Sequence, residues 1–112
     1  MTPETHTPCR TTGCAAGVPM LLRIEGLCPE HFIEQAFASA TKALDHCGHS
    51  LPVDQRLVDW LLSDAAFIAR DLTERADALP APQRDRLLEL LLCLANLHEY
   101  VRHHSVALVP AS

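Results

Sequence analysis

Two short stretches, residues 9–14 (CRTTGC) and residues 28–31 (CPEH), decide the fold of this chain. Each stretch supplies two side chains that bind soft or borderline metal ions. A tetrahedral zinc site needs four such donors from two converging segments, and three cysteines with one histidine are a common structural set. The sequence therefore predicts one structural Zn²⁺ bound by Cys9, Cys14, Cys28 and His31.

Disulfide pairing of these cysteines is the first alternative. The chain has 5 cysteines, an odd number, and residues 1–10 are polar without the apolar run of a secretory signal. No later stretch is long and uncharged enough to cross a bilayer. We therefore expect a cytoplasmic chain with reduced thiols, in which clustered cysteines act as metal ligands. Free thiols without a metal remain the other interpretation.

Composition bounds the size and the partners. The 112 residues suffice for one domain, small enough for a metal to contribute to its stability. The formal charge of −5 argues against binding to nucleic-acid phosphates or to anionic lipid, because the 9 basic residues are scattered. Lys42 is the single lysine, and the excess of arginine, alanine and leucine indicates a GC-rich, bacterial coding sequence.

A first helix is predicted to begin at Cys28. Pro29 suits the first helical position, and Glu30 favours the positive end of the helix dipole. An apolar face follows along the segment, and Gly48 supplies the stop. Because His31 comes one turn after Cys28, both side chains can point the same way.

The residues before this helix are punctuated by proline and glycine. Residues 1–8 are expected to be a flexible tail. Leu22 and Ile24 alternate with charged residues inside the segment 18–25, which glycines bracket. This alternation predicts a short β-hairpin before the helix.

Residues 9–47 resemble the treble-clef class of zinc fingers. The likeness is carried by the knuckle from Cys9 to Cys14 and by Cys28-Pro-Glu-His31 in the first helical turn. Members of this class more often have two residues between the knuckle cysteines, whereas four lie between Cys9 and Cys14. The resemblance implies a knuckle, a β-hairpin and a helix in that order. It implies no single function, because treble clefs occur in nucleic-acid binding, in protein binding and in a few enzymes.

The remaining chain predicts a long antiparallel helical hairpin over residues 52–105. One helix is expected over residues 53–78 and the other over residues 82–104, separated by Pro80 and Pro82. The fold class is therefore mostly α, with the small N-terminal finger and the hairpin packed as one domain. Residues 106–112 are expected to be a second tail.

Both predicted helices have unusually wide apolar surfaces. The arc is wider than packing against one neighbour requires, and residues 87–97 are apolar almost all round. Burial in a homodimer interface would cover this surface, through the predicted contact residues Trp60, Phe67, Leu87, Leu91 and Leu94. A three-helix core without a partner is the alternative, and a different protein partner is a further possibility.

Two groups of histidines raise the possibility of a second metal site. His46, Cys47 and His49 lie near the predicted end of the first helix, where histidine also suits the helix dipole. His98, His103 and His104 lack the spacing that places two ligands on one helical face. We expect ordinary helix-end and solvated histidines at both places.

Three classes of function remain open. The favoured one is a non-catalytic protein-interaction or oligomerisation module in which zinc is structural. The second is a nucleic-acid-binding transcriptional regulator that uses Arg10 and Arg23 beside the knuckle and dimerises through its helices. A zinc-dependent hydrolase is the least favoured, because four protein ligands leave no open position for water. No nucleophile elbow, phosphate loop or dinucleotide-binding motif is present.

Overall fold

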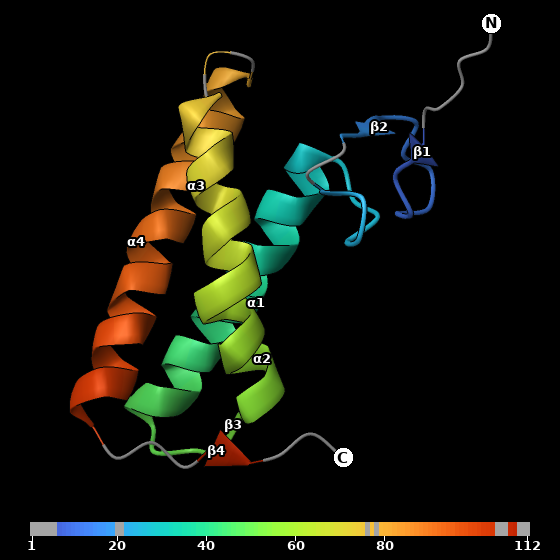
Figure 1. The fold of residues 1–112 in the computed structure, drawn as a ribbon. Coiled ribbons are helices and arrows are strands. Elements are labelled where there is room, and N and C mark those ends of the chain that lie inside the picture. The colour runs from blue at the N-terminus through green and yellow to red at the C-terminus, as the bar shows by residue number, and fades with distance from the viewer. Residues whose placement is uncertain (1–6, 20–21, 76, 78, 105–107, 110–112) are drawn as a thin grey trace, which may run out of the picture.

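The computed structural model describes residues 7–19, 22–75, 77, 79–104 and 108–109. Long helical segments lie side by side, and the N-terminal segment with its two short strands extends from one end of the first helix (Figure 1). The mostly helical class predicted from the sequence is confirmed. Within the described ranges, no helix combines the length and the apolar character that a membrane span requires.

Helix α1 covers Pro29–Gly48 and begins as the sequence predicts. Cys28 is its extended N-cap residue, and the Cys28 carbonyl accepts the first helical hydrogen bond from the Phe32 amide at 2.9 Å. Gly48 is the last helical residue. The left-handed backbone conformation that reverses the chain belongs to Ser50, with φ of 57°, rather than to the glycine.

The second helical stretch consists of three consecutive segments. Asp54 caps α2 (Gln55–Trp60), because its Oδ1 accepts hydrogen bonds from the amides of the second and third helical residues. A π-helical turn, η2 (Leu61–Ala65), follows, and α3 (Ala66–Glu74) continues the helix. The predicted helix over residues 53–78 is therefore shorter at both ends, and residues 76 and 78 lie outside the described residues.

Helix α4 covers Ala81–His103 and has its most extensive contacts with α1 rather than with α3. The helical hairpin predicted for residues 52–105 is therefore not confirmed. The shared core contains no buried polar side chain among the described residues. Its largest fully buried side chains include Phe32 from α1, Leu61 from η2 and Leu90 from α4, so apolar packing joins all three helical stretches.

Four strands of two residues each form two separate pairs. Strand β1 (Thr7–Pro8) is antiparallel to β2 (Gly17–Val18), and β3 (Val53–Asp54) is parallel to β4 (Leu108–Val109). Residues 7–8 and 108–109 therefore do not belong to tails, because each pairs with another segment. The other residues assigned to the two tails, 1–6, 106–107 and 110–112, lie outside the described residues.

The prediction of a β-hairpin within residues 18–25 is wrong. Leu22 to Gly26 form a turn closed by a hydrogen bond from the Gly26 amide to the Leu22 carbonyl, at 2.8 Å. Pro19 lacks the amide hydrogen that would extend a ladder from β2, and its carbonyl accepts from the Leu22 amide instead. The antiparallel pair flanks the knuckle instead of following it as the treble-clef order implies.

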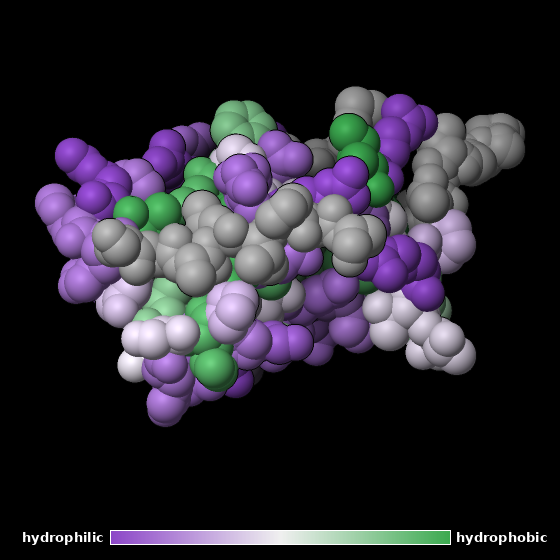
Figure 2. Space-filling model, turned by 90° about the horizontal axis from the view of Figure 1, so that it is seen from below, coloured by the Kyte–Doolittle hydropathy of each residue, from purple (hydrophilic) through white to green (hydrophobic). Residues whose placement is uncertain are grey.

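Figure 2 shows the end of the molecule near β3 and β4, where hydrophilic residues predominate and hydrophobic ones form small separate patches. The large exposed apolar side chains of the helical part lie along the helices instead. Phe67 is 65% exposed, Leu88 55% and Leu92 66%. Among the helices, α3 and α4 therefore carry the large apolar side chains that the core does not use, while Ile24 and Leu51 are exposed in connecting segments.

Replacement of Leu90 by alanine should lower the free energy of unfolding by about 2–5 kcal/mol, because its side chain is fully buried among the helices. Ile24→Ala is the control, because Ile24 is 96% exposed in the turn before α1 and lies outside the helical core, and it should change stability by less than about 0.5 kcal/mol. Urea unfolding followed by circular dichroism measures both. Equal losses for the two variants would contradict the core described above.

Candidate metal centre

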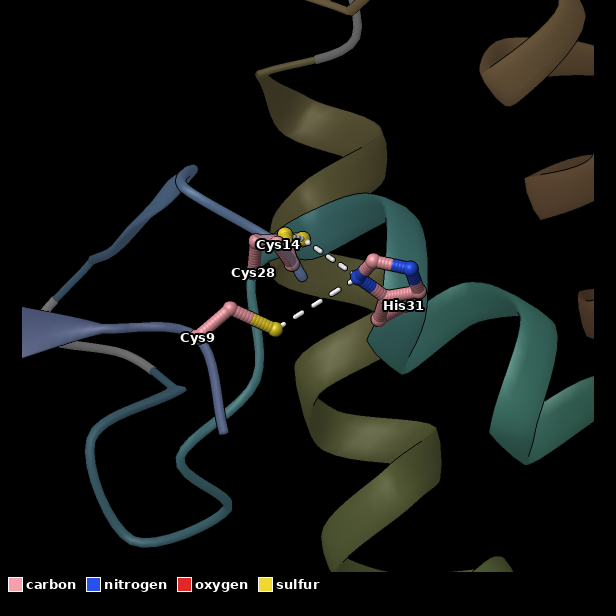
Figure 3. Close-up of side chains that lie close together, drawn as sticks. All are labelled: Cys9, Cys14, Cys28 and His31. Atoms are coloured by element: carbon pink, nitrogen blue, oxygen red, sulfur yellow. Dashed lines mark hydrogen bonds between the residues drawn. The ribbon is translucent and has the colours of Figure 1, made fainter. Parts of the chain in front are cut away.

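Three segments bring Cys9, Cys14, Cys28 and His31 together. Cys9 follows β1 directly, Cys14 ends the knuckle, and the other two lie at the start of α1. Their donor atoms all lie within 4.8 Å of one another, and they form a cluster positioned to bind a metal ion. Figure 3 shows the sulfur of Cys9 and the Nδ1 edge of the His31 ring turned toward each other.

The knuckle is closed by its own backbone. The amide of Cys14 donates to the Thr11 carbonyl at 3.0 Å, which makes residues 11–14 a tight turn. Gly13 lies at the third position of this turn with φ of 82°, a conformation that favours glycine. The Cys9 amide donates to the Ala16 carbonyl at 3.0 Å. The turn therefore takes up the longer spacing between the two knuckle cysteines and returns Cys14 toward Cys9.

Helix α1 sets the other pair of donors. His31 Nδ1 lies 3.2 Å from the Cys28 sulfur and 3.4 Å from the Cys9 sulfur (Figure 3). The sulfurs of Cys14 and Cys28 are 3.9 Å apart. Nδ1 is thus the ring nitrogen that faces the sulfurs of Cys9 and Cys28. The N-terminal turn of α1 aligns Cys28 and His31 on one side, as the spacing predicts.

The side chains of the cluster are largely shielded from solvent. Cys9 is 5% exposed and Cys28 2% exposed, whereas Cys14 and His31 are half-buried. Leu27, beside Cys28, is also buried. Three sulfurs and one imidazole therefore meet at the edge of the hydrophobic core, where a charge needs a nearby compensating group.

The pKa values of two thiols move in opposite directions. Burial raises the pKa of Cys9, but hydrogen bonds involving Thr11, the Cys28 backbone and His31 together outweigh it and lower the pKa to about 5. Burial raises the pKa of Cys28 to about 11, opposed by the His31 backbone and reinforced by the neighbouring cysteine sulfurs. The Cys9 thiol therefore loses its proton more readily than the Cys28 thiol, and repulsion from the neighbouring sulfurs opposes the ionisation of Cys28. A bound cation would offset this repulsion and allow all three sulfurs to be thiolates.

Arg10 fastens the knuckle to the turn before α1. Its Nε donates to the Glu25 carbonyl at 3.0 Å, and its amide donates to the Gly26 carbonyl at 2.8 Å. Gly26 has φ of 70°, and a Cβ atom there would lie 3.4 Å from the Arg10 side chain. The side chain of Arg10 also lies 3.4 Å from Gln35 Oε1 of α1. The sequence indicated Arg10 only as a candidate phosphate contact. No local pattern revealed that Arg10 joins the knuckle to the turn before α1.

Trp60 joins the metal centre to the helices. Its Nε1 donates to Glu25 Oε2 at 3.4 Å, and its ring meets Phe32 edge to face at 6.2 Å. Phe32 directly follows the donor His31, and Glu25 lies in the turn held by Arg10. The sequence predicts Trp60 as a dimer contact, whereas the indole contacts described here are with the metal-bearing segment of its own chain.

The other predicted contact residues divide between core and surface. Leu87 is 1% exposed and Leu94 4% exposed, so both belong to the core of the single chain and their prediction as contact residues is corrected. Leu91 is half-buried, and Phe67 is largely exposed. The burial of Leu87 and Leu94 depends on the packing of α4 on α1. The apolar pattern of α4 did not reveal this contact.

The remaining histidines do not gather into a second group of donors within the described ranges. His46 Nδ1 lies 3.1 Å from the Pro52 carbonyl, and His49 Nδ1 lies 2.9 Å from the Asp45 carbonyl. Cys47 is buried, and burial raises the pKa of its thiol. His98 is exposed on α4. At the end of α4, His103 pairs with Glu99 at 3.1 Å, and the ring of His104 stacks on Tyr100.

Comparison of the chain with protein-family models, with curated proteins and with solved structures finds no match. The candidate site therefore rests on its own geometry and chemistry.

Metal removal should change the fluorescence of Trp60, the single tryptophan of the chain. Its contacts with Glu25 and Phe32 depend on the segment that the metal would hold, so chelation should hydrate the indole and shift its emission to longer wavelength. Emission spectra during titration with a chelator, and during metal return, measure this shift. The Trp60→Phe variant provides the blank, and an unchanged wild-type spectrum after complete metal removal would contradict the coupling.

Proposed function

We propose that this chain is a non-catalytic interaction module whose N-terminal part is folded around one structural Zn²⁺. The observation that carries the proposal is the convergence of three sulfurs and one imidazole nitrogen within 4.8 Å. Soft thiolate ligands select zinc over magnesium or calcium, and four protein donors complete a tetrahedral shell.

The separations within the cluster support this choice of metal. With Zn–S bonds of about 2.3 Å and Zn–N bonds of about 2.0–2.1 Å, a tetrahedron places sulfurs about 3.8 Å apart and sulfur from nitrogen about 3.6 Å apart. The Cys14 and Cys28 sulfurs are separated by 3.9 Å, and His31 Nδ1 lies 3.2 and 3.4 Å from two sulfurs. Small side-chain movements suffice to close these atoms around the ion.

A structural role for zinc follows from the closed ligand set. Catalytic zinc keeps one position for water or substrate, whereas here protein atoms fill all four. The exposed apolar side chains of α3 and α4 favour a function in association. Interaction through this surface, rather than a reaction at the metal, is therefore the role that we assign.

Replacement of Cys28 by serine should abolish tight zinc binding and reduce stability. Zinc that binds only the folded state contributes about 4 kcal/mol when its free concentration is a thousand times its dissociation constant. Elemental analysis gives the zinc content, and thermal unfolding gives the stability. Cys93→Ala is the matched control, a buried cysteine of α4 outside the cluster, and should retain one zinc per chain. Zinc-free wild-type protein, purified without chelator, would refute the proposal.

The isolated chain should not bind generic duplex DNA at physiological salt. Affinity of this kind needs several cations on one face, while the chain has a net charge of −5 and Arg10 is engaged with Glu25 and Gln35. Fluorescence anisotropy with labelled duplex DNA, repeated over a range of salt concentrations, tests this expectation. Micromolar binding that weakens with salt and is lost in the Arg10→Ala/Arg23→Ala variant would favour the regulator instead.

A further inference from the structure

A groove of about 300 Å³ lies between α4 and the helical stretch formed by η2 and α3. Its apolar lining includes Leu62 and Ala66 on one side and Leu91 and Ala95 on the other. Two basic side chains, Arg70 and His98, complete it from opposite helices. An occupant that fits this lining has apolar side chains at its centre and acidic groups beside them.

Helix α4 itself carries a surface of this description. Leu88 and Leu92 are 55% and 66% exposed, and Ala95 is exposed beside them. Asp85 comes three residues before Leu88, and Glu99 comes four residues after Ala95. Because spacings of three and four residues align side chains on one helical face, these five form a continuous stripe with an apolar middle and acidic ends.

The charges on the two surfaces are available for contacts with another molecule. Among the described residues, neither Arg70 nor Asp85 forms an ion pair, whereas Asp71 on α3 pairs with Arg75 at 3.1 Å. Glu99 is 63% exposed at its side chain and pairs only with His103 within the described ranges. Within the described part of the chain, the exposed cation Arg70 beside the groove and the exposed anion Asp85 on the stripe are thus both without an ion-pair partner.

We propose that the occupant of the groove is a second copy of this chain. The stripe of one copy, with Leu88 and Leu92 at its centre, lies in the groove of the other. Asp85 and Glu99 then approach the partner's Arg70 and the partner's His98. Twofold symmetry fills both grooves with the same contact.

This inference names the partner of the interaction module proposed above and rests on that proposal for its context. The metal centre and the groove involve different residues, so the two can fail separately. Purified protein that lacks zinc would refute the structural zinc site but not the dimer. A zinc-containing protein that is monomeric would refute the dimer but not the zinc site.

The apolar contact is tested first. Wild-type zinc protein should sediment as a dimer at micromolar concentration, and Leu92→Glu should shift it to the monomer with unchanged zinc content and circular dichroism. Ile24→Glu is the matched control, because Ile24 is 96% exposed in the turn before α1, away from the groove. A wild-type monomer overturns the proposal, and so does a dimer that Leu92→Glu leaves intact.

The charge contact is tested by reversal. Arg70→Glu and Asp85→Arg should each weaken the dimer by about tenfold or more, because each places like charges together across the interface. The double variant Arg70→Glu/Asp85→Arg restores the opposite signs and should recover most of the wild-type affinity. Sedimentation equilibrium measures all four proteins. A double variant that is weaker than both single variants overturns the assigned orientation.

Discussion

The first turn of α1 carries the constraint on which the rest of the structure depends. Cys28 caps the helix and His31 lies one turn later, so the direction of α1 and the position of two donors are set by the same backbone. Phe32, next to His31, is fully buried in the core. Metal binding and helix packing therefore act on one rigid element, and neither can shift without the other.

The metal centre and the helical core stabilise the chain by different means. The core is apolar throughout its described part, which gives a non-directional gain proportional to the buried area. The knuckle has little apolar material, and a few hydrogen bonds and the left-handed Gly13 define its path. Such a segment gains its order from bonds at specific angles, which a tetrahedral ion supplies.

The sequence predicted the structure best where a helix-start signal and the spacing of metal ligands fell on the same residues. Pro29 after Cys28 predicted the helix start, and ligand spacing predicted which four side chains would meet. The strands were not predictable, because pairs of two residues have no periodicity and β3 pairs with a segment 55 residues later. The burial of Leu87 and Leu94 depends on the contact of α4 with α1, a non-local property.

Trp60 determines how strongly the metal could influence association. It contacts Glu25 and Phe32 of the metal-bearing region and stands directly before η2, whose Leu62 lines the groove. A disturbance of the metal centre can therefore reach the groove through the continuous helix from α2 to α3. The coupling is the difference between the dimerisation free energies of the metal-bound and the metal-free chain, and dimerisation must change the free energy of metal binding by the same amount. Because the core side chains on both sides of Trp60 are fully buried, this close-packed helix transmits a displacement of Trp60 toward the groove.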